Sequence, residues 1–390
     1  MVIVLPSFKK VQKLIDKLNG VTRENLTGIR VVRAFNAEKY QEDKFEQANN
    51  NLTKQQLFNQ RAFAIMQPVM YMVMHMVTLG IYFVGAYLIN EAAMADKIVL
   101  FGDMVVFSSY ALQVIMSFLM LAMIFMMLPR AVSANRINEV LETQSSIKDG
   151  NITKNSKDEK GTVEFKNVCF KYPDADEYLL QNISFKANKG DTVAFIGSTG
   201  SGKSTLINLV PRFYDATGGE VLVDGVNVKD YSLEYLHNKL GYVPQKAVMF
   251  NGTVTSNIEY GDNGKQKPTI EQVKKAIEVA QGTEFVEKMD NSYNAHIAQG
   301  GTNISGGQKQ RLAIARAVAR DPEIYIFDDS FSALDYKTDS VLRKELKNYT
   351  KDATSLIVAQ RIGTIMNADK IIVLDDGKCV GQGTHKELLK

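Results

Sequence analysis

Residues 197–205 constrain the chain more than any other stretch, because they match the phosphate-loop pattern G-x-x-x-x-G-K-[ST] without a mismatch. A short apolar, β-branched run, Thr192 to Ile196, precedes the loop, and Leu206 to Val210 follows it with the character of a helix start. The motif therefore has the strand–loop–helix setting in which backbone N–H groups turn onto phosphate oxygens. The sequence predicts a nucleotide-binding site here, in preference to a glycine-rich turn that binds nothing.

Each residue of this loop is a candidate ligand of the nucleotide. The positive charge of Lys203 suits phosphate, and the hydroxyl of Ser204 suits Mg²⁺. The full candidate set is Gly197, Ser198, Thr199, Gly200, Ser201, Gly202, Lys203, Ser204 and Thr205.

Charged residues are distributed unevenly, although the overall composition, with 23% charged residues and a net charge of +3, is ordinary. Lys, Arg, Asp and Glu are absent from residues 62–90 and from residues 104–128. A membrane helix needs about 20 residues, so both segments predict membrane spans; two buried helices of a soluble protein are the alternative. The small net charge offers no argument for nucleic acid as a partner.

Basic residues flank the pair of predicted spans on the outside, whereas the link between the spans is mixed in charge. The flanking residues are Lys9, Lys10, Lys13, Lys17 and Arg61 upstream and Arg130 and Arg136 downstream, and the link holds Glu91, Asp96, Lys97 and Asp103. The positive-inside rule then predicts that both flanks are cytoplasmic. The two cysteines, Cys169 and Cys379, form no metal-ligand spacing and agree with a reducing compartment.

The segment before the spans, residues 7–60, has apolar residues at threes and fours among charged ones. This spacing predicts amphipathic helices in water, with a turn near Asn36-Ala37-Glu38. A plain soluble helical hairpin is the alternative. Within the first span, His75 is a candidate functional residue, because ionisable groups inside membranes are costly; a neutral histidine that is hydrogen-bonded to a neighbouring helix is the interpretation that we favour.

The pattern of predicted secondary structure changes after the second span. Residues 1–141 predict an all-α region, and residues 142–160, which are rich in Ser, Asn, Lys and Asp, predict a linker. Alternating strands and helices from Gly161 onward predict a mixed α/β nucleotide-binding domain over residues 161–390. The expected elements include strands at 163–165, 168–170, 193–196 and 324–327 and helices at 205–214, 306–319 and 338–349.

A second anion-binding motif lies far along the chain. Ser305-Gly306-Gly307-Gln308 opens a helix, and the strand at 324–327 ends in Asp328-Asp329, from which a carboxylate can reach Mg²⁺. A phosphate loop combined with this second motif resembles the ATP-binding cassette (ABC) transporters, in particular the C-terminal part of a half-transporter of the multidrug-exporter type. Residues 24–35 also look like the cytoplasmic helix that follows the fourth membrane span of that family.

The resemblance implies ATP and Mg²⁺ as ligands and assigns roles to further residues. Tyr172 matches the aromatic residue that stacks on adenine, and Gln245 and Asp328 match residues that, with Ser204, contact Mg²⁺. The signature Ile304, Ser305, Gly306, Gly307 and Gln308 would contact ATP held by a partner chain. Loops at 332–335 and 299–302 match segments that face the dimer interface and the membrane domain, and residues 36–45 match a coupling helix.

Two candidate catalytic positions depart from the family pattern. Asp329 stands where the family carries a glutamate base, and Gln360 stands where it carries a switch histidine. Aspartate is one methylene shorter, which withdraws its carboxylate by roughly 1–1.5 Å, and a misplacement of about 1 Å can cost about 100-fold in rate. Glutamine donates a hydrogen bond but cannot become cationic. We therefore expect this site to bind ATP and to hydrolyse it slowly.

The expected function is that of a multi-pass cell-membrane subunit with a cytoplasmic ATP-binding domain, which exports amphipathic drugs, lipids or peptides. A weakened base beside an intact signature favours a second, different half-transporter as partner; a homodimer is the alternative. Two different functions compete with export, namely a soluble ATPase or kinase and a membrane nucleotide sensor that transports nothing. Because the family has six spans per half, we expect the first third of a half-transporter to be absent, with Met1–Pro6 the tail of the fourth span.

Overall fold

The computed structural model describes residues 4–154 and 160–390, with side chains described except at 4–9, 63, 66, 119, 122, 123 and 125–136. Contacts divide the chain into two compact units, Met1–Gln144 and Ser145–Lys390. The predicted tail of a fourth span falls partly outside the described residues, as do the side chains of Arg130 and Arg136. Each unit is described by itself.

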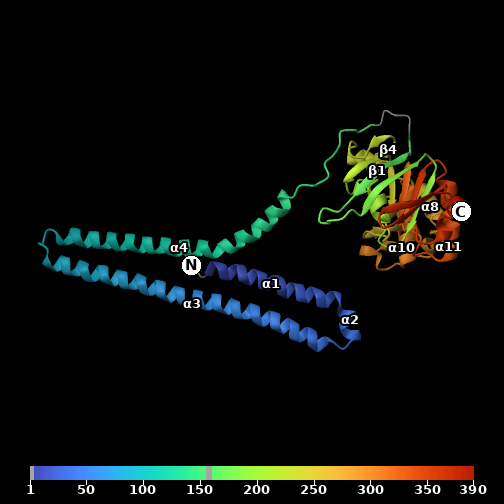
Figure 1. Ribbon diagram of the computed structural model, residues 1–390. Helices are drawn as coiled ribbons and strands as arrows, with labels where there is room; N and C mark the ends of the chain where they lie inside the picture. The colour runs from blue at the N-terminus through green and yellow to red at the C-terminus, as the bar shows by residue number, and fades with distance from the viewer. Residues whose placement is uncertain (1–3, 155–159) are drawn as a thin grey trace. The chain divides into compact units, whose positions relative to one another are not determined.

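The first unit is built from long helices. They are α1 (Val4–Thr27), α2 (Ile29–Ala34), α3 (Glu38–Glu91) and α4 (Lys97–Glu142). Figure 1 shows α3 and α4 side by side as a hairpin, with α1 alongside α3. The predicted turn between the amphipathic helices is present, since α2 ends at Ala34 and Asn36 adopts a positive φ of 49° before α3 begins.

Both predicted spans lie in helices that are long enough to cross a bilayer. Among the described residues, two helical segments are long and apolar enough, Glu38–Glu91 and Lys97–Phe118. At 1.5 Å per residue, α3 is about 80 Å long, which is more than a bilayer crossing requires. Its first half is polar and its second half is apolar. The side chain of His75 is exposed on α3, and within the described part of this unit it makes none of the interhelical hydrogen bonds that we favoured.

The second unit contains two larger sheets and a two-stranded one. A four-stranded antiparallel sheet has the order β2-β1-β4-β5, and a six-stranded sheet has the order β12-β11-β3-β10-β9-β6, in which only the edge pair β11–β12 is antiparallel. The strands are β1 (Val163–Phe170), β2 (Leu180–Ala187), β3 (Thr192–Gly197), β4 (Gly218–Val223), β5 (Val226–Asn227), β6 (Leu240–Val243), β7 (Gly252–Thr253), β8 (His296–Ile297), β9 (Ile324–Asp328), β10 (Thr354–Val358), β11 (Lys370–Asp375) and β12 (Lys378–Gly383).

The second unit also contains helices. They are α5 (Lys203–Asn208), α6 (Leu233–Asn238), α7 (Val254–Ile258), α8 (Ile270–Val279), α9 (Thr283–Glu287), α10 (Gly306–Ala319), α11 (Tyr336–Tyr349), α12 (Ile362–Ile365) and α13 (His385–Leu388), with short 3-10 turns at Ser292–Asn294 and Gln299–Gly301. In Figure 1, the labels α8, α10 and α11 lie together, apart from β1 and β4.

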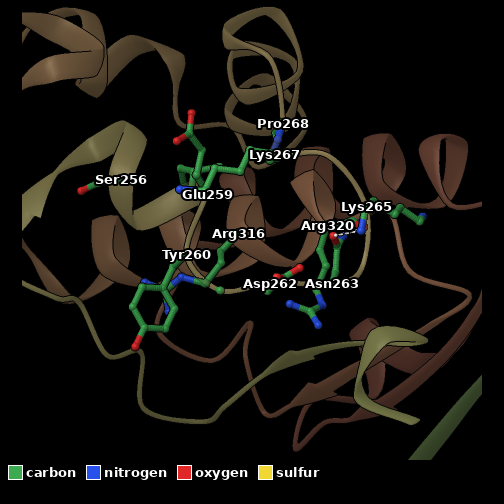
Figure 2. A pocket seen from close by; sticks show the side chains of 12 residues that line it. Ser256, Glu259, Tyr260, Asp262, Asn263, Lys265, Lys267, Pro268, Arg316 and Arg320 are labelled. Carbon is green, nitrogen blue, oxygen red and sulfur yellow. Dashed lines mark hydrogen bonds between the residues drawn. The ribbon is translucent and has the colours of Figure 1, made fainter. Parts of the chain in front are cut away.

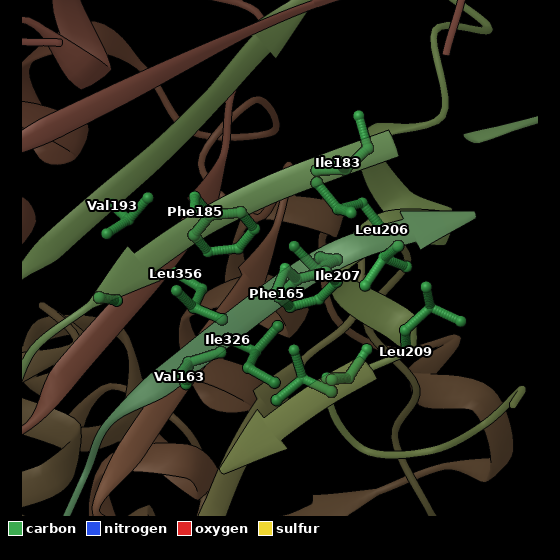
Figure 3. Packing of buried hydrophobic residues seen from close by; sticks show 14 of the residues in the cluster. Val163, Phe165, Ile183, Phe185, Val193, Leu206, Ile207, Leu209, Ile326 and Leu356 are labelled. Atoms are coloured by element: carbon green, nitrogen blue, oxygen red, sulfur yellow. The ribbon is translucent and has the colours of Figure 1, made fainter. Parts of the chain in front are cut away.

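Strand β9 separates two hydrophobic cores because its successive side chains point to opposite faces. Ile324 and Ile326 join a core with Phe165 and Phe185 of the antiparallel sheet and with α5. Figure 3 shows Phe165 and Ile326 of this core beside Leu206 and Ile207 of α5. Tyr325 and Phe327 join the second core, with α8 and α10. A strand that is buried on both faces explains why β9 is continuously apolar.

Two predicted elements differ from the structure. The helix predicted over 205–214 ends at Asn208. Pro211 has no N–H donor, and the turns after Asn208 are closed by hydrogen bonds between residues three apart, from the N–H of Leu209 to the carbonyl of Leu206 and from the N–H of Arg212 to the carbonyl of Leu209. The two strands predicted at 163–165 and 168–170 are one strand, β1, interrupted by a register shift at Asn167, where φ is 47°.

Part of the segment predicted to be a linker is attached to the second unit. The N–H of Gly150 donates to the carbonyl of Tyr231 at 3.0 Å, and Ile152 forms a parallel bridge with the same residue. A Cβ atom at Gly150 would overlap the backbone of Asp230, so only glycine allows this close approach. Residues 149–152 therefore form a strap beside the start of α6.

Replacing Gly150 with valine is expected to detach this strap, because the branched side chain cannot enter the contact with Asp230. Hydrogen exchange of the purified protein should show faster exchange at the amides of Ile152 and Ser232, whose bonds join the strap to the domain. Asn151→Val is the matched control, since Asn151 is exposed and its exchange profile should remain that of the wild type. Unchanged protection in Gly150→Val would refute this account of the strap.

Candidate functional site

The predicted site residues meet where parallel strands end. Strand β3 ends at the phosphate loop, β9 ends at Asp328 and is followed by Asp329, β6 leads into Gln245, and β10 leads into Gln360. Because β6, β9, β10 and β3 are parallel neighbours, their carboxyl ends lie along one edge of the sheet. Ligands of open α/β sheets bind at such an edge.

The phosphate loop has a conformation that depends on glycine. Gly202 has a φ of 91°, and a Cβ atom there would lie 2.6 Å from the side chain of Leu180. A Cβ atom at Gly197 would overlap the backbone carbonyl of Leu374 on the neighbouring strand. Helix α5 begins directly afterwards at Lys203, so its first N–H groups have no acceptor within the helix and are available to an anion. The loop therefore fits a polyphosphate.

The ammonium group of Lys203 lies inside this loop. Its Nζ donates to the carbonyl oxygens of Gly197 at 2.9 Å and Ser198 at 2.6 Å, and to the hydroxyl of Ser201 at 3.3 Å. Burial lowers the pKa of Lys203, and the nearby carboxylates of Asp329 and Asp328 oppose that shift. A bound phosphate would exchange these neutral acceptors for charged oxygens, which form stronger hydrogen bonds.

The Ser204 hydroxyl and the Asp328 carboxylate are already adjacent. Ser204 donates to Oδ1 of Asp328 at 2.6 Å, and the Asp328 side chain is buried. Burial raises the pKa of Asp328, and the hydrogen bond from Ser204 opposes that rise. A hydroxyl and a carboxylate are oxygen ligands of the kind that Mg²⁺ prefers, so this pair fits the ion predicted from the sequence.

The carboxylate of Asp329 is held by two amides. Its Oδ2 atom accepts hydrogen bonds from Nε2 of Gln360 at 2.7 Å and from Nε2 of Gln245 at 3.4 Å. The backbone of Asp329 has a φ of 45°, a left-handed conformation that aspartate tolerates better than most residues. Burial raises the pKa of Asp329, while its hydrogen bonds with Gln245, Ser332 and Gln360 act to lower it. The two positions that depart from the family pattern are thus in direct contact.

Tyr172 lies next to the loop through its hydroxyl group. Its Oη atom is 3.0 Å from the hydroxyl of Thr205, and its ring packs edge-on against Tyr214 at 5.2 Å between centroids. Phe170 supports the same ring from the strand. The aromatic ring is therefore placed beside the phosphate loop, as stacking on an adenine of the same nucleotide requires.

The signature forms a separate helix start. Ser305 caps α10, accepting a hydrogen bond from the N–H of Gln308, whose side chain in turn accepts from the N–H of Ser305 at 2.8 Å. Between the signature, residues 304–308, and the phosphate loop, both of which are described, no hydrogen bond or ion pair is formed. The structure thus brings together the loop, Gln245, Asp328, Asp329 and Gln360, and leaves the signature apart.

Several supporting contacts were not anticipated from the sequence. The hydroxyl of Ser330 donates to the carbonyl of Val243 at 2.9 Å, and Gln310 of α10 donates to the carbonyl of Pro244 at 3.2 Å. These bonds fix the segment that carries Gln245. Because each donor meets a backbone carbonyl that is remote in sequence, at or just after the end of β6, no local sequence pattern could have revealed it.

A hollow of about 410 Å³ lies elsewhere in the second unit, beside α7 and α10. Figure 2 shows Arg316 and Arg320 lining it with Tyr260. The guanidinium of Arg316 stacks at 5.6 Å from the ring centroids of both Tyr260 and Phe250. Its nitrogens also donate to the carbonyls of Asn257 and Val248, so Arg316 stabilises the fold of this part of the domain.

Comparison with known proteins accounts for both units. Residues 180–332 match the family model described as ABC transporter, and residues 2–118 match the model described as ABC transporter transmembrane region. Together the two regions include well over half of the chain. The chain belongs to the ABC transporter family. The prediction of a helical membrane region followed by an α/β ATP-binding domain is confirmed.

Individual relatives support the same assignment. The chain is 44% identical over 388 residues to an uncharacterized ABC transporter ATP-binding protein of Mycobacterium tuberculosis, covering 99% of this chain and 66% of the relative. It is 35% identical over 383 residues to an ATP-dependent lipid A-core flippase of Pseudomonas aeruginosa, covering 98% of this chain and 62% of the relative. The chain thus spans slightly less than two thirds of the length of these relatives.

A solved structure is similar in fold to nearly all of this chain. The structure of a bacterial Atm1-family ABC exporter with ATP bound superposes with a TM-score of 0.82 at 27% identity, covering 98% of this chain and 68% of that one. ABC ATP-binding domains bind ATP, so the prediction that ATP is the nucleotide of this domain is confirmed. The protein is a membrane protein, and its ATP-binding domain is on the cytoplasmic side.

Proposed function

We propose that this chain is a subunit of an ATP-driven exporter whose own phosphate loop binds ATP with Mg²⁺ and hydrolyses it slowly. The observation that carries the proposal is the contact between Asp329 and Gln360 at the ends of β9 and β10, beside the loop that holds Lys203. The site has the parts for binding, but its base is short and its switch residue cannot take a proton.

Each part has a specific task in the proposed reaction. Water attacks the γ-phosphorus in line while the bond from that phosphorus to the bridging oxygen breaks and ADP leaves. Asp329 accepts the proton of the attacking water, and Lys203 stabilises charge on the phosphate oxygens. Ser204, Asp328 and Gln245 would hold Mg²⁺, which when bound supplies further positive charge to the phosphates. Gln360 fixes the orientation of the Asp329 carboxylate, because their hydrogen bond is short at 2.7 Å.

The partner is proposed to be a second, different half-transporter. The signature of this chain, residues 304–308, retains its capping box and its two glycines, so it can complete an ATP site on another chain. A partner with a glutamate and a histidine at the positions equivalent to Asp329 and Gln360 would then contain the site that hydrolyses ATP quickly. A homodimer with two slow sites is the competing assembly, and a membrane nucleotide sensor without transport is the competing function.

The exported substrate is proposed to be amphipathic, namely a drug, a lipid or a peptide. The relationship to a protein described as a lipid A-core flippase supports a lipid. The apolar contact between α3 and α4, where Gly85 lies against Met104, is compatible with any of the three, because methionine side chains adapt to varied apolar partners. Stimulation of ATP hydrolysis by lipid, drug or peptide added to the transporter in nanodiscs would separate these classes and would exclude the sensor.

Replacing Tyr172 with alanine is expected to weaken ATP binding by roughly 5–150-fold, because stacking on a base contributes about 1–3 kcal/mol. Tyr172→Phe is the matched control: it keeps the ring and loses only the hydrogen bond to Thr205, so its Kd should stay within about threefold of the wild type. Titration with a fluorescent ATP analogue measures both. An alanine variant that binds as tightly as the wild type would show that Tyr172 does not contact adenine.

A further inference from the structure

Helix α11 carries an ion pair that does not belong to the site described above. Asp339 and Arg343 are one helical turn apart, and their contact is bidentate, with Nε to Oδ1 at 2.9 Å and Nη2 to Oδ2 at 3.1 Å. The Asp339 side chain is 3% exposed and that of Arg343 is 20% exposed. A bidentate, buried geometry of this kind fixes the guanidinium plane, which an exposed pair of flexible chains does not.

The remaining nitrogen of this arginine holds a different helix. Nη1 of Arg343 donates to the carbonyl of Gly363 at 2.9 Å and to that of Thr364 at 3.3 Å. Both carbonyls belong to α12, a helix of four residues in which most carbonyls have no intrahelical partner. A cation at the end of a helix also interacts favourably with the helix dipole. Asp339 thus orients Arg343, and Arg343 secures α12.

Helix α12 begins two residues after Gln360. The intervening residue, Arg361, donates from Nη2 to the carbonyl of Ser332 at 3.3 Å. The segment from Gln360 to Thr364 is therefore tied at two points by arginines, one to the loop after Asp329 and one to α11. On its other side, α12 is anchored in an apolar cluster through Ile365.

Helix α11 starts directly at the end of the 332–335 loop. Asp335 caps it, accepting from the N–H of Thr338 at 3.0 Å, and Asp339 follows one turn later. A hollow of about 650 Å³ lies between α11, α12 and β10 and is lined by Arg343 and Thr364. The guanidinium group of Arg343 therefore reaches from α11 to α12 at the edge of this hollow.

We propose that Asp339 and Arg343 are positioning residues that hold Gln360 against Asp329 and link this contact to the 332–335 loop. This inference rests on the proposed role of Gln360 in ATP hydrolysis. If Arg343 is removed, α12 loses its tie to α11, the amide of Gln360 is less well placed, and the carboxylate of Asp329 loses its fixed orientation. Nucleotide binding, which depends on the phosphate loop, is unaffected.

The test is a double-mutant cycle between Arg343→Met and Gln360→Ala in the assembled transporter in lipid nanodiscs. Single-turnover ATP hydrolysis at this chain's site is measured with the partner's catalytic carboxylate neutralised, beside the Kd for a fluorescent ATP analogue. Arg343→Met is expected to slow hydrolysis roughly 2–10-fold with an unchanged Kd, and to have no further effect when Gln360 is already alanine. Lys347→Met, which removes a longer 3.4 Å bond from the next turn of α11 to Asn367, is the matched control and should leave the rate unchanged.

The possible outcomes separate the inference from the function on which it rests. If Gln360→Ala leaves the rate unchanged, both the proposed role of Gln360 and the inference are wrong. If Gln360→Ala slows hydrolysis but the two effects multiply, Arg343 has only a structural role and the inference alone is overturned. Should Arg343→Met fail to fold, Arg343→Lys replaces it, since lysine keeps the charge and loses the bidentate geometry; the inference then requires a slower rate that again disappears in the Gln360→Ala background.

Discussion

Replacing Asp329 with glutamate and Gln360 with histidine together is expected to accelerate ATP hydrolysis at this site by roughly 100-fold, because a misplacement of about 1 Å costs about that much. The added methylene would carry the carboxylate toward the γ-phosphate, and the imidazole can both donate a hydrogen bond and carry a proton. The rate is measured by single-turnover hydrolysis in the assembled transporter, with the partner's catalytic carboxylate neutralised.

The single variants serve as controls for this double change. Asp329→Glu alone should account for most of the gain, since Gln360 already donates to the carboxylate at 2.7 Å. Because the backbone φ of Asp329 is 45°, where glutamate is less favoured, the thermal midpoint should be measured beside the rate. A stable double variant that hydrolyses ATP no faster than the wild type would show that these two residues do not limit the reaction.

Replacing Lys239 with methionine is expected to destabilise the ATP-binding domain by about 3–5 kcal/mol, the usual cost of removing one partner from a buried ion pair. Lys239 Nζ lies 2.8 Å from Asp224 and 2.8 Å from Glu323, and the Asp224 side chain is 0% exposed. Burial acts to lower the pKa of Lys239, but its hydrogen bonds to the two carboxylates outweigh burial and raise the pKa above the ordinary lysine value. The cation is therefore retained at neutral pH.

This network joins the turn after β4 to the beginnings of β6 and β9, so its loss affects both large sheets. Scanning calorimetry of the transporter should show the domain melting roughly 6–20 °C lower, the range expected for a domain of this size. The double variant Lys239→Met with Asp224→Asn should regain much of the loss, because it also removes the fully buried carboxylate that the single variant leaves unpaired, whereas Glu323 is partly exposed. A loss below about 1 kcal/mol in the single variant would contradict the importance of this pair.

The sequence predicted the parts of the site that lie within continuous motifs. The phosphate loop and the signature were recognisable because phosphate binding requires specific residues at fixed spacing, as Gly202 and Ser305 illustrate. The edge where Asp328 lies was predictable from the apolar run of β9. The turn at Asn36 was predictable from the break in helical spacing, whereas the early end of α5 was hidden by apolar residues around Pro211.

The contacts between remote segments could not be predicted. That Gln360 and Gln245 both donate to one oxygen of Asp329 depends on which strands are neighbours, and the sequence does not state the order of the sheet. Only the pairing of Arg343 with Asp339 could have been predicted, because aspartate and arginine four residues apart on a helix often pair. Its acceptors on Gly363 and Thr364 are backbone atoms and leave no trace in residue identities.

The most direct test of the central claim is steady-state ATP turnover by the assembled transporter, carrying either Asp329→Asn in this chain or a neutralised catalytic glutamate in the partner. We predict that turnover survives Asp329→Asn and is lost when the partner's carboxylate is neutralised, because in the proposed heterodimer this chain contributes its signature to the fast site and its phosphate loop to the slow one. If this chain purified alone is active and Asp329→Asn abolishes the activity, the site is fully competent, and the proposed division between a slow and a fast half is wrong.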